Sequence, residues 1–167
     1  MGKKATKAAD NVFCIARYEA AKENTIFSSR ETAAEIIGLD RTRLARIELG
    51  AVIPYPEEVL AISKAYRMPE LCNQYCAREC PIGRLTIQEV NITEFDRLIL
   101  KVLGSTTNID ELRGSLIKIA ADGIIDDSEK PEFHAVLESL ERISENAQAL
   151  KLWAMKYLNG YEKETER

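Results

Sequence analysis

Apolar side chains recur at helical spacing through the first half of the chain, between short polar or glycine-containing breaks. Steps of three and four residues bring such side chains to one face of a helix, because successive residues turn by about 100°. The pattern predicts helices over residues 11–24, 29–37, 40–49, 56–66 and 69–80. Asp40 and Pro56 stand where helices typically start, and Gly38 stands where one typically ends.

The second half continues the helical pattern after a short stretch, residues 83–92, which we interpret as a linker. The spacing predicts one helix capped by Thr93 or by Asn91, and a second from Asn108 to about Ala121. A long helix follows from about residue 129 to residue 158. Its apolar residues alternate in steps of three and four: Phe133, Val136, Leu140, Ile143, Ala147, Leu150, Ala154 and Tyr157. This series fits a seam against the two preceding helices, and it also fits a self-associating surface.

The predicted fold is therefore all-α. A five-helix N-terminal domain, residues 9–82, precedes the linker and a C-terminal helical hairpin or three-helix domain, residues 93–160, with a long terminal helix. Charge separates the two halves: residues 1–85 carry 13 basic and 11 acidic side chains, whereas residues 86–167 carry 10 and 16. The net charge of −4 is thus concentrated in the second half, and any surface that binds phosphates belongs to the first.

The most informative segment is GLDRTRLARIELG, residues 38–50. Leu44 and Ile47 form the inward stripe of its short helix. The other side carries Thr42, Ala45, Arg46 and Leu49, with Arg41 and Arg43 on the flanks. A helix this short is not stable alone in water, so neighbouring helices must hold it in place. A docked helix with arginines and small residues on its outer side fits the major groove of DNA.

The preceding segment, SSRETAAEIIG, predicts a capped helix that ends at Gly38, directly before the arginine helix. Two helices joined by a short turn containing glycine form a helix-turn-helix unit. From about Ala9 to Pro69, the sequence resembles the lambda-repressor-like (XRE-type) helix-turn-helix regulators. Three departures are visible: Ala33 where a larger apolar residue is usual, Leu49 where a polar one is common, and a segment after Gly50, AVIPYP, without Lys or Arg.

The resemblance assigns DNA-binding roles to five side chains. Arg30 lies where the family contacts a phosphate, and Arg41, Thr42 and Arg46 lie where the recognition helix reads base edges. Arg43 is placed for either the backbone or a base. Arginine suits both tasks, because its guanidinium donates two parallel hydrogen bonds to guanine or to phosphate oxygens.

Four cysteines leave three interpretations open. Cys72, Cys76 and Cys80 are spaced i, i+4, i+8 on one predicted helix, and Cys14 lies on the first. They are expected to be small buried thiols, but they also fit a zinc site or a redox-active pair. The family that the sequence resembles needs no metal to fold, so no cofactor is expected.

Catalysis has little support in the sequence. His134 is the only histidine, and no nucleophile motif or phosphate-binding loop is present, so the chain is not expected to be an enzyme. No apolar run reaches membrane-spanning length and no signal peptide is visible, which predicts a cytoplasmic protein.

Two functions remain. The first is a sequence-specific transcriptional regulator, a dimeric repressor that binds double-stranded DNA and forms a homodimer through the C-terminal helices. The second is a protein-interaction module of the antitoxin or anti-repressor type, which keeps the fold with little affinity for DNA. The neutral segment after Gly50 and the overall acidity favour the second.

Overall fold

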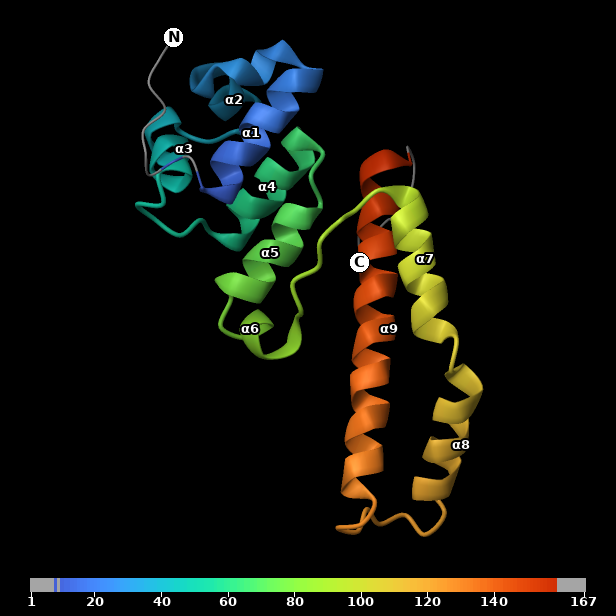
Figure 1. Ribbon diagram of the computed structural model, residues 1–167. Coiled ribbons are helices and arrows are strands. Elements are labelled where there is room, and N and C mark those ends of the chain that lie inside the picture. Colours follow the sequence, from blue (N-terminus) through green and yellow to red (C-terminus); the bar gives the residue numbers. More distant parts are fainter. Residues whose placement is uncertain (1–7, 9, 159–167) are drawn as a thin grey trace, which may run out of the picture. The chain divides into compact units, whose positions relative to one another are not determined.

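The structure, a computed structural model, describes residue 8 and residues 10–158, so the predicted domain limits at residues 9 and 160 lie outside this part. All regular structure in it is helical and no strand occurs, which confirms an all-α chain with a long C-terminal helix. The elements are α1 (Val12–Glu23), the 3₁₀ turn η1 (Thr25–Ser28), α2 (Arg30–Ile37), α3 (Arg41–Glu48), α4 (Pro56–Tyr66), α5 (Glu70–Arg78), α6 (Gly83–Thr86), α7 (Phe95–Thr106), α8 (Ile109–Ile119) and α9 (Lys130–Tyr157). They divide between two compact units, Met1–Glu89 and Val90–Arg167 (Figure 1).

The helices of the first unit start where their caps predict. The side chain of Asn11 accepts the backbone N–H groups of Phe13 and Cys14, and Ser29 starts α2 by accepting that of Glu31. These bonds satisfy N–H groups that have no partner inside the helix. Pro56 starts α4 at its first position, where the missing N–H costs nothing.

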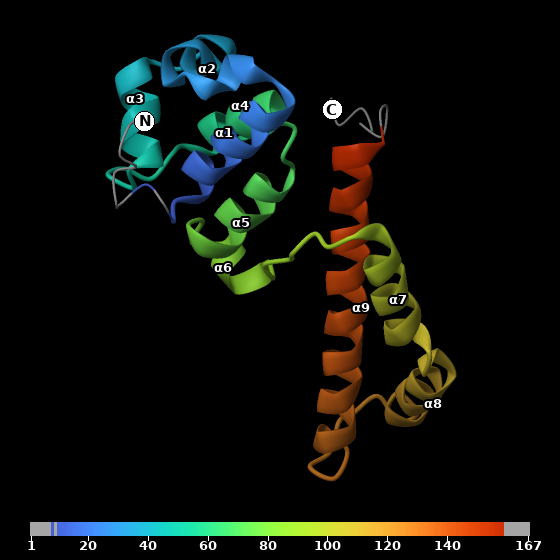
Figure 2. The ribbon, with the colours of Figure 1, turned by 45° about the horizontal axis from the view of Figure 1, so that its top comes forward.

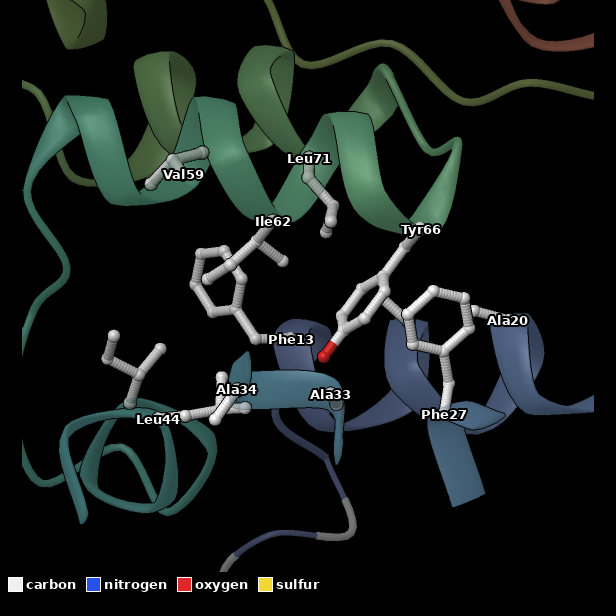
Figure 3. Close-up of a cluster of buried hydrophobic side chains, with 12 residues drawn as sticks. Phe13, Ala20, Phe27, Ala33, Ala34, Leu44, Val59, Ile62, Tyr66 and Leu71 are labelled. Atoms are coloured by element: carbon white, nitrogen blue, oxygen red, sulfur yellow. The ribbon is translucent and has the colours of Figure 1, made fainter. Parts of the chain in front are cut away.

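One apolar core joins α1 to α5 of the first unit (Figure 3). Leu44 of α3 and Ile62 of α4 are fully buried in it. Phe27 meets Tyr66 edge to face, with ring centroids 5.2 Å apart. The short helices α2 and α3 are thus held by contacts with longer neighbours, as their length requires.

Residues 83–92, predicted to be a linker, contain a short helix at the start and a buried side chain near the end. Gly83 starts α6 and is itself buried, because the turn passes directly over the backbone of Cys76. Val90, only 2% exposed, packs with Leu98 in the core of the second unit. The chain between them, residues 87–89, has no regular structure.

In the second unit, α7 and α8 descend along α9, which runs back past both (Figures 1 and 2). The buried core consists of Val90, Leu98, Ala149 and Leu152. On α8, Ile119 is the buried residue, whereas Ile117, which the spacing places inward, is 63% exposed. The reason is geometric: α8 packs chiefly against α9, so only a narrow strip of its surface is covered. None of the described helices combines the length and apolarity needed to cross a bilayer.

Candidate nucleic-acid interface

Helix α3 is fixed at its start and along its inner side. The Asp40 carboxylate accepts the backbone N–H of Arg43 at 3.0 Å, which places a negative charge at the positive end of the helix dipole. The residues between α2 and α3 begin with Gly38, whose φ of +79° is accessible to glycine at little cost. Leu44 and Ile47 are 0% and 1% exposed, so the helix presents one fixed face to the outside.

The outer face of α3 carries Arg41, Thr42 and Arg46, all exposed. Among the described residues, neither arginine forms an ion pair, so both guanidinium groups are available to a ligand. Leu49, 38% exposed, adds an apolar side chain at the end of the helix. The structure therefore brings three of the five predicted residues to one accessible surface.

Arg43 differs, because an internal carboxylate holds it. Its Nε and Nη2 each donate to Glu58 at 2.8 Å, and Nη2 also lies 3.4 Å from the carbonyl oxygen of Ile53. The guanidinium lies over the ring of Tyr55, 4.9 Å from its centroid. The hydrogen bond from Arg43 lowers the pKa of Glu58, against the effect of burial. Arg43 therefore ties α3 to the start of α4 and leaves only Nη1 unassigned.

Arg30 is anchored in a similar way. Its Nε donates to Glu48 at 2.8 Å, and its side chain is 33% exposed, so the guanidinium lies at the edge of a buried site. Glu48 is 0% exposed and also binds Arg17, with Nε–Oε1 and Nη2–Oε2 distances of 2.7 and 3.3 Å. Arg17 closes the network by donating to the carbonyl oxygens of Phe27 and Ser28, each at 3.1 Å.

The network of Arg17, Glu48 and Arg30 joins α1, α3 and the start of α2, and Arg17 and Glu48 are buried from water within it. Burial opposes the charge of Arg17, but the hydrogen bond and the charge of Glu48 outweigh it and raise the pKa of Arg17. One carboxylate shared by two arginines leaves the group with a positive charge at its exposed end, where Arg30 lies. That end lies at the N-terminus of α2, whose dipole also favours an anion.

Arg17 and Glu48 were not among the predicted site residues, although the sequence contains a signal for them. Glu48 follows Ile47 and lies four residues after Leu44, on the buried stripe of α3. Arg17 occupies the corresponding inward face of α1, where it is 3% exposed. Opposite charges at inward positions of two helices indicate a buried pair, because an unpaired buried charge is too costly to retain.

The surface beside α3 is neutral and apolar rather than basic. The connection from α3 to α4 exposes Ile53 and Tyr55, 61% and 65% accessible, and contains no lysine or arginine. Positive charge at the candidate interface therefore comes from Arg41 and Arg46, with Arg30 and Arg43 at the margins.

The cysteines and the histidine lie apart from this surface. All four cysteines are thiols: Cys14 is buried in α1, whereas Cys72, Cys76 and Cys80 are half-buried in and just after α5. Burial, and then the neighbouring thiols of Cys80 and Cys72, raise the pKa of Cys76. In the part of the chain that the structure describes, no three His, Cys, Asp or Glu side chains converge as a metal site would require. His134 is exposed on α9.

Comparisons with models of protein families, with curated proteins and with solved structures found no match. The candidate interface is therefore defined by the side chains of α2 and α3 and by their fixed geometry.

Proposed function

We propose that this chain is a sequence-specific DNA-binding regulator of the lambda-repressor-like helix-turn-helix type, in which α2 and α3 form the helix-turn-helix and α3 reads the major groove. One observation carries the proposal: α3 is capped and docked, yet directs the exposed Arg41 and Arg46 outward, and no carboxylate among the described residues pairs with either. Unpaired arginines on a rigid helix are suited to base edges and phosphates, since binding neither breaks an internal ion pair nor orders the helix.

Each predicted residue takes a definite role in this proposal. Arg41, Thr42 and Arg46 contact base edges. Arg30 uses the guanidinium nitrogens that Glu48 leaves unoccupied to bind a phosphate. Arg43 acts chiefly through Glu58, by fixing α3 against α4, and offers Nη1 at most to the backbone.

The proposal includes a cytoplasmic homodimeric repressor. One eight-residue helix reads only a few base pairs, and the first half of the chain carries a small positive charge, so a single copy binds weakly. Two copies place two recognition helices on half-sites one helical turn apart. The second unit supplies the association, because it retains exposed apolar side chains such as Leu137 and Leu140 of α9.

The test is a salt titration of binding to duplex DNA, with fragments from upstream of the protein's own coding region and a random duplex of equal length. We expect a preference of about 10³-fold or more for the upstream fragment, and a steep fall of log K with log salt. Arg41→Ala and Arg46→Ala should each weaken specific binding by about 1–3 kcal/mol and relax specificity at one base position. Arg113→Ala, an exposed arginine on α8, is the matched control and should leave binding unchanged.

Weak and equal binding to both duplexes would contradict the proposal. Full binding by Arg41→Ala and Arg46→Ala would show that another surface makes the contacts.

A protein-interaction module is the second candidate function, and one observation favours it. Ile53 and Tyr55 form an exposed apolar surface beside α3, where a DNA-binding protein would gain from basic residues. In that case Tyr55→Ala would abolish partner binding while Arg46→Ala would have little effect. The effects of Tyr55→Ala and Arg46→Ala on binding to a co-purified partner are compared. A larger loss in Tyr55→Ala favours the interaction module over the regulator.

A further inference from the structure

Helix α9 has a face that neither α7 nor α8 covers. Its buried residues are Val136, Ala149, Leu152 and Ala154. A separate stripe is exposed: Leu137, Leu140, Ser144, Ala147 and Lys151 follow one another in steps of three and four. Leu137 and Leu140 are 39% and 40% exposed. This spacing is that of a helix with a partner helix along its length.

Charge is divided along the same helix. Residues 130–145 carry four glutamates against Lys130 and Arg142, so this half is acidic. Residues 146–158 carry Lys151 and Lys156 and no acidic residue, so this half is basic. A helix that is acidic at one end and basic at the other is complementary to a second copy of itself in the reverse direction.

We propose that α9 pairs antiparallel with α9 of a second copy of this chain, and that the two helices cross where Ser144 faces Ala147. Small side chains at the crossing allow the helix axes to approach closely. The proposal rests on the homodimer included in the proposed function, and it specifies which surface makes that dimer and in which direction.

The residues of the exposed stripe favour the antiparallel direction over the parallel one. In the register set by Ser144 opposite Ala147, Leu140 lies opposite Lys151 of the second copy, and Glu141 lies beside that lysine. The methylene groups of Lys151 then cover the leucine while its ammonium reaches the carboxylate. In a parallel pair of the same stripe, Lys151 faces Lys151, and like charges in contact disfavour association.

The experiment is sedimentation equilibrium of the full chain over a concentration series, with charge reversals at the proposed contact. We expect a wild-type dimer, and dimerisation weakened by about tenfold in Lys151→Glu and in Glu141→Lys. The double variant, Glu141→Lys with Lys151→Glu, should recover the wild-type dissociation constant, because the pair is restored with its signs exchanged. These residues are ten positions apart in one helix, so the recovery arises between copies.

The matched control is Glu138→Lys, the same charge change three residues before Glu141 on an exposed position outside the stripe; it should leave dimerisation unchanged. Circular dichroism of every variant should show that the helices are retained, because these side chains are exposed. A monomeric wild type, single variants that dimerise normally, or a double variant no better than the singles would each overturn the proposal. The outcome is separable from DNA binding, because the effect of Arg46→Ala on binding to a single half-site is measured in a separate assay and reports the proposed function alone.

Discussion

The two units of this chain are stabilised to different degrees by their own contacts. Among the described residues, the core cluster of buried apolar side chains in the first unit has twelve members, whereas the cluster in the second unit has four. Side chains of Asn11, Ser29 and Asp40 cap α1, α2 and α3, whereas α7, α8 and α9 start without a side-chain cap. The first unit also contains a buried charged network around Glu48.

The difference shows which surface of each unit is available for function. In the first unit, the inward apolar residues of α3 are buried in the core. The outer face of α3 can therefore carry Arg41 and Arg46 without loss of stability. In the second unit Leu100, Leu103 and Ile117 are 60–69% exposed, and apolar surface of this extent favours association. The one tryptophan of the chain, Trp153, packs on Phe95 of the second unit at a centroid distance of 4.5 Å. Its fluorescence therefore reports the second unit separately.

The largest effect is expected from Glu48→Ala. Removing the carboxylate leaves Arg17 buried without a counter-ion, which costs about 3–5 kcal/mol of the free energy of unfolding. Urea unfolding followed by far-ultraviolet circular dichroism should show that the helices of the first unit unfold at a lower urea concentration. The unfolding transition followed by Trp153 fluorescence should keep its midpoint. An equal shift of both signals would mean that the two units unfold together.

Two matched leucine-to-alanine substitutions, one in each unit, test whether the units unfold separately. Leu44 and Leu98 are 0% and 1% exposed, in the first and second unit respectively. Each change to alanine should cost about 2–5 kcal/mol, through lost burial and the cavity left behind. Leu98→Ala should lower the midpoint of the Trp153 transition and Leu44→Ala should not; the reverse pattern would contradict the division into units.

Two glycine-to-alanine changes should have opposite signs. A Cβ on Gly83 would lie 2.1 Å from the carbonyl oxygen of Cys76, so Gly83→Ala must displace backbone and should destabilise the first unit by about 1–3 kcal/mol. Gly114 in α8 has no neighbour within 4 Å of such a Cβ, and Gly114→Ala should stabilise the second unit by about 0.5–1 kcal/mol. Thermal unfolding followed by the same two signals checks both signs.

The smallest effect is a pH dependence of the contact between Arg43 and Glu58. The pKa of Glu58 is lowered in the folded protein, so its contribution to stability is present above the ordinary carboxyl pKa and is lost as pH falls through the folded-state value. The stability difference between wild type and Glu58→Gln should therefore be largest at neutral pH and should shrink as the pH falls below the ordinary carboxyl pKa of about 4.3. Urea unfolding across that range measures it, and a difference that persists in acid would exclude the ion pair as its cause.

Local features of this chain could be predicted well because their causes lie within a few residues. Asp40 caps α3 by binding an N–H three positions later, and Gly38 and Pro56 act through their own backbone conformations. The helical periodicity also placed Leu44 and Ile47 inside. The burial of the long apolar series of α9 could be predicted less well. The series combines a buried face that includes Val136 with an exposed face that includes Leu140.

By itself, the sequence determined where most helices begin and end, and which way the short arginine helix faces, because capping and amphipathic periodicity act over one or two turns. Only the tertiary structure decided which of the arginines form ion pairs with carboxylates. Arg30 and Arg43 meet carboxylates 18 and 15 residues away, whereas Arg41 and Arg46 meet none among the described residues. Which charges pair depends on how whole helices pack, and side chains far apart in sequence come together only after that packing is complete.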